Sequence, residues 1–216
     1  VLTTRELVRM IKAFHILPKT LSDAQPDRLF HDVTGAGIIF GATGGVMEAA
    51  LRTAYYSLMG ENCPPDAFKV VRAQSQKTGL TEATFSLNNI DLHIAVVNGL
   101  ANTRKLIEEI DRGEKKYDFV EVMACPGGCV GGGGQPIHDG EELAFTRGKN
   151  LYFLDKNANI RHSHENPDIK TLYKNYFGTP NSHKAHQVLH TDHFAWEMPK
   201  RLLRDKDGYI IRERRI

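Results

Sequence analysis

The strongest constraint on the fold is a glycine-rich stretch that carries two cysteines, residues 123–136. Two of the chain's three cysteines, Cys125 and Cys129, lie in it four positions apart among six glycines. The stretch follows directly on an apolar, strand-like run at residues 117–122. Folding alone does not require thiols and glycines to be concentrated in this way. We therefore predict a functional site where a strand ends.

The residue types indicate which ligand this stretch binds. Glycine has no side chain, so backbone N–H groups can approach a bulky bound group. Thiolates bind soft metals and iron–sulfur clusters, so an inorganic ligand is predicted. Zinc bound by Cys63, Cys125, Cys129 and a histidine is the alternative. The spacing of Cys125 and Cys129 differs from the CxxC pattern of structural zinc sites.

Alternating strand and helix patterns predict an α/β fold with a mainly parallel, twisted sheet flanked by helices. After residue 136 the pattern changes to a helical and loop-rich C-terminal third, without a further strand and with residues 200–216 as surface or linker. Strands are predicted at residues 37–40, 68–73, 84–87, 91–97 and 117–122, and helices at 4–14, 46–59, 99–112, 139–154, 167–177 and 183–190. Thr3 and Glu6 have the spacing of a capping box, and Asn88 with Asn89 is the expected turn of a hairpin. A loop is expected at residues 17–36 and a turn at 205–208. The expected apolar face of the helix at 46–59 consists of Val46, Ala50, Leu51, Ala54 and Leu58.

A second glycine turn, residues 41–45, lies between a predicted strand and a predicted helix. It is either a tight connecting turn or a place where the helix N-terminus faces an anionic group. The P-loop pattern is absent, and Gly35 and Gly37 lack the third glycine of the dinucleotide fingerprint, so nucleotide binding is disfavoured.

Histidines and the remaining cysteine offer further candidates. Cys63 precedes two prolines and is interpreted as an incidental buried thiol. His162 and His164 flank a serine and are expected to point to opposite sides of an extended segment, in a structural role. Four more histidines have a spacing that places them on one face of a helix: His183, His186, His190 and His193. A role in packing or hydrogen bonding is favoured for them, and zinc binding is the alternative.

Composition excludes several classes of protein. A formal net charge of +2 does not argue for nucleic acid, and no apolar run is long enough for a membrane span. Three cysteines do not form a secreted disulfide framework. Because the sequence starts at Val1, we expect an excised piece of a longer chain. The expected compartment is the cytoplasm, with the periplasm left open.

Residues 122–136 resemble the third signature motif of iron-iron hydrogenases, which interconvert dihydrogen with protons and electrons. Residues 40–52 resemble a second stretch of that family, and residues 1–7 and 163–167 also fit its pattern. The resemblance implies that residues 1–216 form the C-terminal lobe of the hydrogenase catalytic domain, with residues 192–216 as a divergent surface tail.

The resemblance also implies a role for individual residues. Cys125 is expected to ligate the 4Fe-4S cluster of the active-site H-cluster, and Cys129 to ligate it and bridge to the two-iron subsite. Met123 and Phe40 are expected to line the pocket of the two-iron subsite. The residues expected to contact the cofactor are Gly41, Thr43, Gly44, Pro126, Gly127 and Gly128.

The activity implied is reversible oxidation of H2, with a ferredoxin or a nicotinamide-linked protein as electron partner. Because the family's other two cysteine motifs are expected upstream, in the rest of the hydrogenase chain, these residues alone are expected to be inactive. The alternative is a hydrogenase-like iron–sulfur assembly scaffold without the two-iron site. Such scaffolds are expected to carry polar residues where this chain has Gly128 and Gly131, which favours the enzyme.

Overall fold

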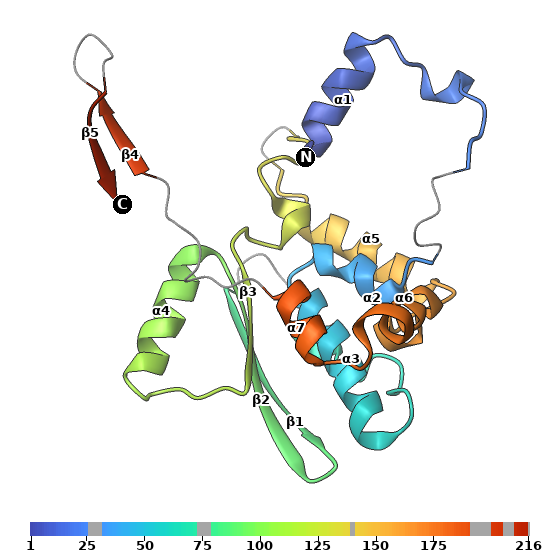
Figure 1. Cartoon of the computed structure of the whole chain (residues 1–216), viewed down its shortest axis with the longest axis vertical. Helices are drawn as coiled ribbons and strands as arrows, with labels where there is room; N and C mark the ends of the chain where they lie inside the picture. The colour runs from blue at the N-terminus through green and yellow to red at the C-terminus, as the bar shows by residue number, and fades with distance from the viewer. Residues whose placement is uncertain (26–31, 73–78, 139–140, 191–199, 205–209, 216) are drawn as a thin grey trace. The chain divides into compact units, whose positions relative to one another are not determined.

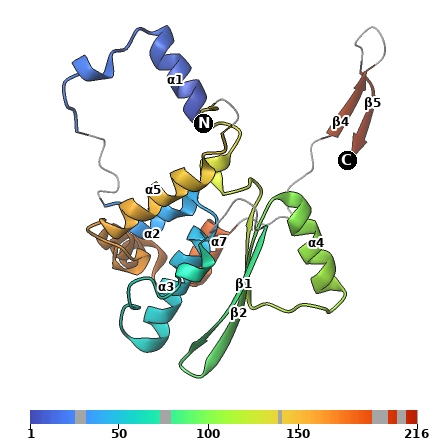
Figure 2. The ribbon, with the colours of Figure 1, turned by 180° about the vertical axis from the view of Figure 1, so that it is seen from behind.

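The chain divides into two compact units, Val1–Lys170 and Thr171–Ile216, which are described separately. The structure is a computed structural model that describes residues 1–25, 32–72, 79–138, 141–190, 200–204 and 210–215. Figure 1 shows the elements along the chain, and Figure 2 shows them from behind. None of the helices in these residues is long and apolar enough to cross a membrane.

The first unit opens with helix α1, Thr4–Ala13, as predicted. Thr3 and Glu6 form a capping box, in which the Glu6 N–H donates to the Thr3 hydroxyl and the Thr3 N–H donates to the Glu6 carboxylate. This arrangement satisfies two N–H groups that have no partner within the helix. A short 3-10 turn, Pro18–Thr20, follows in the segment that was predicted to be a loop.

The predicted strand at residues 37–40 is wrong, because this run is helical. It forms α2, Gly35–Ile38, and then the 3-10 turn η2, Ile39–Gly41. The Thr34 hydroxyl accepts the Gly37 N–H at 3.0 Å and starts the helix. An apolar run of four residues does not distinguish a strand from a helical turn. This run contacts α5, Ala144–Lys156, and buries Ile39, whereas Phe40 is exposed.

Helix α3, Gly45–Met59, begins directly after the glycine turn, as predicted. Gly44 has φ +86° and Gly60 has φ +77°, so both ends take the left-handed conformation that glycine permits. The predicted apolar face is only partly right: Leu51 is buried, whereas Ala50 and Leu58 are exposed. The buried face instead includes charged side chains, which a hydrophobic pattern does not reveal.

The sheet is mixed rather than mainly parallel, so that prediction is wrong. Its order is β1-β2-β3, with β1, Leu80–Leu87, antiparallel to β2, Ile90–Asn98, and β2 parallel to β3, Phe119–Met123. A two-residue turn at Asn88 and Asn89, with φ +48° and +63°, closes the predicted hairpin. Helix α4, Leu100–Asp111, makes the parallel crossover.

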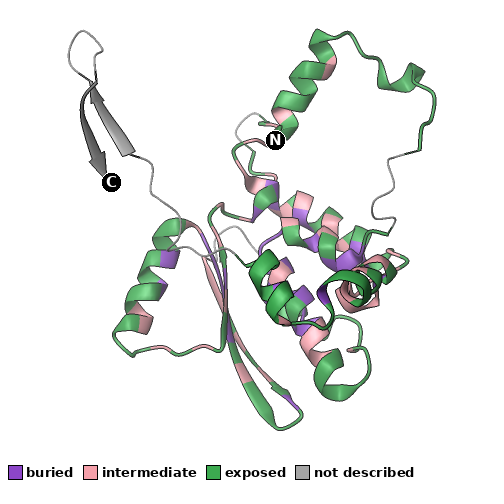
Figure 3. Ribbon diagram, viewed as in Figure 1, coloured by how far each residue is buried: buried purple, intermediate pink, exposed green. Residues whose placement is uncertain are grey.

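The described part of the predicted strand at 68–73 forms the 3-10 turn η3, Lys69–Val71, and Ala73 lies outside the described residues. Phe68, just before η3, and Val71 within it pack against Ile94 and Val96 of β2, whereas Val70 is exposed. Figure 3 shows the buried residues along β2 and α3. Two groups of core residues meet β2: one contains Met47, Leu51, Phe68, Val71, Ile94 and Val96, the other Ala95, Val97 and Leu106.

β2 is thus covered on both faces, because successive side chains of a strand point to opposite sides. Each fully buried aliphatic or aromatic side chain contributes about 1.5–3 kcal/mol. This core fixes the strand whose parallel neighbour, β3, leads into the cysteine loop.

After that loop the first unit continues with α5, which starts later than predicted, and with the 3-10 turn η5, Ser163–Glu165. Residues 139 and 140 of the predicted helix lie outside the described part. Helix α6, Pro167–Leu172, begins at the predicted proline.

The second unit contains the π-helical turn η6, Tyr173–Phe177, which ends before Gly178 at φ +83°, and α7, His183–Leu189, capped by Ser182. Strands β4, Lys200–Arg204, and β5, Ile210–Arg215, pair antiparallel, so the prediction of no further strand is wrong. The predicted turn at 205–208 lies outside the described residues. A predicted turn with a short run of residues on each side also indicates a β-hairpin, so the turn at 205–208 was a signal for these two strands.

Candidate cofactor site

The cysteine loop begins where β3 ends, as predicted. Gly127 and Gly128 take φ +81° and +91°, a region open to glycine, and reverse the chain between the cysteines. The Gly128 N–H donates to the Cys125 carbonyl at 2.9 Å, and the 3-10 turn η4, Cys129–Gly131, follows. Cys125 is half-buried and Cys129 is exposed, so a ligand can reach the Cys129 thiol.

The turn that precedes α3 packs directly on this loop. The Thr43 N–H donates to the Gly127 carbonyl at 3.1 Å. A Cβ atom on Gly128 would lie 2.8 Å from both the Gly41 carbonyl oxygen and the Thr43 nitrogen. Glycine at position 128 is therefore required by the close approach of two backbones as well as by its φ angle. The two glycine turns that the sequence showed separately form one wall.

Glu121 on β3 holds this wall in place. Its buried carboxylate accepts the N–H groups of Gly44 at 2.6 Å and Met47 at 2.7 Å, at the N-terminus of α3. A helix N-terminus carries unpaired donors and partial positive charge, so a carboxylate is stabilised there. Burial nevertheless raises the pKa of Glu121, and these N–H groups offset part of the rise. A single acidic residue within the apolar run 119–123 was the sequence signal for this role.

Two arginines hold the glycine run from outside. Arg147 on α5 donates to the carbonyl of Val130 at 3.0 Å and to that of Pro136 at 2.7 Å. The Arg5 N–H donates to the Gly134 carbonyl at 3.1 Å, and its guanidinium donates to the Gly133 carbonyl. Arginine suits this task because its planar group offers several donors in fixed directions. No pattern in the sequence indicated either contact.

Phe40 and Gly41 lie in the turn that forms this wall, and Met123 is the last residue of the strand that leads into the cysteine loop. Phe40 and Gly41 belong to η2, which contacts η4, and the Phe40 side chain is 47% exposed. Met123 ends β3 and is half-buried. A Cβ atom on Gly41 would lie 2.8 Å from Leu151 Cδ1 on α5, so a larger residue there would require the Leu151 side chain to move.

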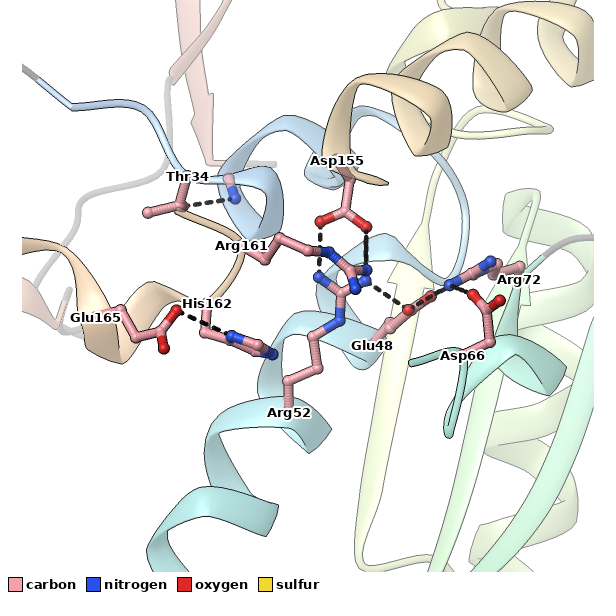
Figure 4. A network of polar contacts seen from close by, with 10 residues as sticks. Thr34, Glu48, Arg52, Asp66, Arg72, Asp155, Arg161, His162 and Glu165 are labelled. Carbon is pink, nitrogen blue, oxygen red and sulfur yellow. Dashed lines mark hydrogen bonds and ion pairs between the residues drawn. The ribbon is translucent and has the colours of Figure 1, made fainter. Parts of the chain in front are cut away.

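A buried ionic network fixes α3 on α5 behind the wall (Figure 4). Arg52 donates to Glu48 at 2.6 Å and to both carboxylate oxygens of Asp155 at 2.8 Å. Arg72 and Arg161 are the second partners of Glu48 and Asp155. Although burial by itself raises the pKa of Asp155, the hydrogen bonds from Arg52 and Arg161 lower it overall. The helical pattern indicated α3, but no sequence signal indicated these pairs.

The remaining predicted candidates lie elsewhere. Cys63 is half-buried rather than buried; it packs against the core around Met47, and partial burial raises the pKa of its thiol. Within the described residues, the three cysteines do not join any group of three or more possible metal ligands. The described residues thus show no preformed group of Cys63, Cys125, Cys129 and a histidine, as the zinc alternative proposed.

The predicted histidine roles have mixed outcomes. His186 and His190 stack, with ring centroids 4.5 Å apart, and His193 lies outside the described residues. The prediction that His162 and His164 point to opposite sides is wrong, because their rings stack at 5.2 Å. Both lie at η5, where the 3-10 turn replaces the extended backbone on which the prediction rested.

The residues at the loop fit a thiolate-bound cluster. Two soft donors, Cys125 and Cys129, lie in one loop. A Cβ atom on Gly132 would lie 3.1 Å from the Cys129 carbonyl oxygen and 4.0 Å from the Cys125 sulfur, so a glycine there keeps the backbone next to both cysteines uncrowded. The Thr43 hydroxyl in the facing turn is buried and has no hydrogen-bond partner within the described part of the chain. Such an orphaned donor is available to a bound group.

By fold and site, the chain is an α/β protein with a cysteine pair suited to an iron–sulfur group. It belongs to the iron-only hydrogenase family: residues 1–133 match the model of the iron only hydrogenase large subunit, C-terminal domain. Residues 141–196 match the model of the iron hydrogenase small subunit.

The similar proteins include hydrogenases and an iron–sulfur cluster assembly factor. The chain is 45% identical to the NADP-reducing hydrogenase subunit HndD of Solidesulfovibrio fructosivorans over 90% of its own length and 33% of the relative. It is 38% identical to a solved variant of the FeFe-hydrogenase HydA1 of Chlamydomonas reinhardtii, with a TM-score of 0.67 over 86% of this chain and 53% of that one. A cytosolic Fe-S cluster assembly factor of Xenopus tropicalis is 32% identical over 91% of this chain and 41% of the relative.

Proposed function

We propose that this chain is the C-terminal part of the catalytic domain of an iron-iron hydrogenase, and that the complete protein interconverts H2 with protons and electrons. The observation that carries the proposal is the contact of the Thr43 turn with the loop of Cys125 and Cys129. The chain spans about a third of the length of the relative HndD, so this activity is assigned to the complete protein.

In this proposal Cys125 ligates a 4Fe-4S cluster, and Cys129 ligates it and bridges to the two-iron subsite. The group supplies the redox chemistry of hydrogen when it is bound. The protein supplies thiolates and close backbone walls. Backbone N–H groups near the thiolates would adjust the reduction potential of the bound group. Those of Gly128, Gly131 and Gly132 already donate to carbonyl oxygens within the loop.

Phe40 and Met123 are the proposed apolar lining of the two-iron subsite. Both belong to the segments that meet at the loop: Phe40 comes from η2 and Met123 from the end of β3. The other proposed cofactor contacts are Gly41, Thr43, Gly44, Pro126, Gly127 and Gly128. Apolar side chains there exclude water from the reacting metal, which limits side reactions.

The isolated chain is proposed to be inactive. Its sequence holds three cysteines, whereas a four-iron cluster takes four thiolates, and Cys63 joins no possible metal-ligand group with the other two in the described residues. Iron and sulfide analysis and a methyl viologen hydrogen assay on the isolated chain test this. Sustained hydrogen turnover by the isolated chain would refute the proposal that it lacks ligands needed for the cluster.

The proposed electron partner is a ferredoxin or a nicotinamide-linked protein, and the relative HndD is named as NADP-reducing. The proposed compartment is the cytoplasm, with the periplasm as the alternative. All three cysteines are free thiols, which suits a reducing compartment.

The decisive experiment is infrared spectroscopy of the full-length protein that contains this chain. Bands of metal-bound CO and cyanide are expected, and Cys129→Ser is expected to abolish them together with hydrogen turnover. Cys63→Ser is the matched control, because this thiol lies away from the loop, and it is expected to leave the bands in place. The absence of such bands in the unmodified protein would instead favour the second candidate, an iron–sulfur assembly scaffold like the relative from Xenopus tropicalis.

A further inference from the structure

A second cluster of potential metal ligands lies at η5, outside the cysteine loop. One ligand atom each of His162, His164 and Glu165 can be chosen so that all lie within 4.8 Å of one another. All three residues are half-buried, so the group is shielded without being closed to solvent. It is the one group of this kind among the described residues.

The side chains of this group are already joined by hydrogen bonds. Glu165 contacts His162 Nδ1 at 3.0 Å through one oxygen and accepts from Asn62 at 2.6 Å through the other. The Asn62 side-chain oxygen lies 2.8 Å from His164 Nε2. Figure 4 shows the pair of His162 and Glu165. These hydrogen bonds therefore join Asn62, in the segment that follows α3, to the residues of η5, which lie about a hundred positions later in the chain.

The imidazole of His164 is held in a fixed orientation. Its ring stacks on Tyr56 at a centroid distance of 4.2 Å and on His162 at 5.2 Å. The Thr53 hydroxyl lies 3.1 Å from His164 Nδ1. Contacts of this kind orient histidine ligands in metal sites and strengthen binding.

The dimensions suit a small divalent cation. Zinc lies about 2.0–2.2 Å from nitrogen and carboxylate ligands, so two tetrahedral ligand atoms stand about 3.4 Å apart. His162 Nδ1 and the Glu165 oxygen are 3.0 Å apart, already near that spacing. The widest separation, within 4.8 Å, needs to close by about 1.4 Å, which rotation of half-buried side chains can provide.

We propose that His162, His164 and Glu165 form a binding site for zinc or a similar divalent transition-metal ion, with the Asn62 oxygen as a fourth, neutral donor. Imidazole and carboxylate ligands favour ions of this class over magnesium or calcium. The bound ion ties the segment after α3 to η5. The site is separate from the cysteine loop and does not depend on the proposed hydrogenase function.

The test is a titration of the full 216-residue chain with cobalt(II), whose visible absorption reports nitrogen and oxygen ligands, followed by displacement with zinc. A parent variant with Cys63, Cys125 and Cys129 changed to serine removes competing thiolates. His162→Gln and Glu165→Gln retain hydrogen-bonding capacity while removing a strong ligand. The matched control is the double variant His186→Gln/His190→Gln, which removes a stacked histidine pair on α7. Circular dichroism verifies that each variant is folded.

We expect one equivalent of cobalt to bind the parent and the control, and each of the two single variants to bind at least about tenfold more weakly. Zinc is expected to raise the melting temperature of the parent and not of the single variants, since an ion that binds only the folded chain stabilises it. Binding that is absent in the parent, equal in all variants, or lost only in the α7 control would overturn the proposal.

Discussion

The buried guanidinium of Arg52 allows the sharpest test of how the site is supported. Arg52→Met keeps the length of the side chain and removes its charge. Three charge-assisted hydrogen bonds, of 2.6, 2.8 and 2.8 Å, are lost. The Glu48 and Asp155 carboxylates remain, each with a side chain that is only 2% exposed.

The size of the expected loss in the free energy of unfolding depends on which ion-pair partners these two carboxylates keep. Breaking a buried ion pair by removing one partner costs about 3–5 kcal/mol, because the remaining charge stays desolvated. Glu48 keeps Arg72 at 2.6 Å, and Asp155 keeps Arg161 at 2.8 Å. We therefore expect the lower end, a loss of about 3 kcal/mol in the free energy of unfolding. That corresponds to about a hundredfold change in the folding equilibrium.

Urea denaturation followed by circular dichroism measures this loss. The control is Arg112→Met, which breaks an ion pair with Glu114 that is exposed on both sides, and little change is expected there. If Arg52→Met stays within about 1 kcal/mol of the unmodified chain, the network does not hold α3 on α5 and the reasoning fails.

Three further predictions concern the same scaffold. Gly128→Ala places a Cβ atom 2.8 Å from two backbone atoms at φ +91°, so a loss of about 2 kcal/mol or more is expected in urea denaturation, whereas Gly133→Ala, where no atom lies within 4 Å, is expected to cost much less. Glu121→Gln leaves one of two N–H donors facing an amide NH2 group and is expected to cost about 1–3 kcal/mol by the same assay. The folded-state pKa of Asp155 is lowered, so its stabilisation is present above the unfolded value near 3.8 and is lost as the pH falls through the folded-state pKa. Acid titrations of stability are therefore expected to show a smaller loss below that value for Asp155→Asn than for the unmodified chain, and equal losses would contradict the assignment.

Local chemistry was predictable from the sequence where it depends on neighbouring residues. Thr3 with Glu6 predicted the cap of α1, and Asn88 with Asn89 predicted the hairpin turn. The strand that delivers the cysteine loop was likewise predicted from its apolar run. The apolar run at 37–40 was predicted wrongly, because four apolar residues fit either a strand or a buried helical turn, and packing against α5 decides between them.

The sequence by itself determined the chemistry of the site: thiols at Cys125 and Cys129, and glycines where backbones must approach. Only the tertiary structure decided what surrounds them, because those contacts join residues that are far apart in the chain. Glu121 reaches the N-terminus of α3, and Arg147 reaches the carbonyl groups on both sides of the glycine run. Hydrogen bonds and buried ion pairs depend on distances of a few ångströms between distant segments, and no spacing within one segment records them.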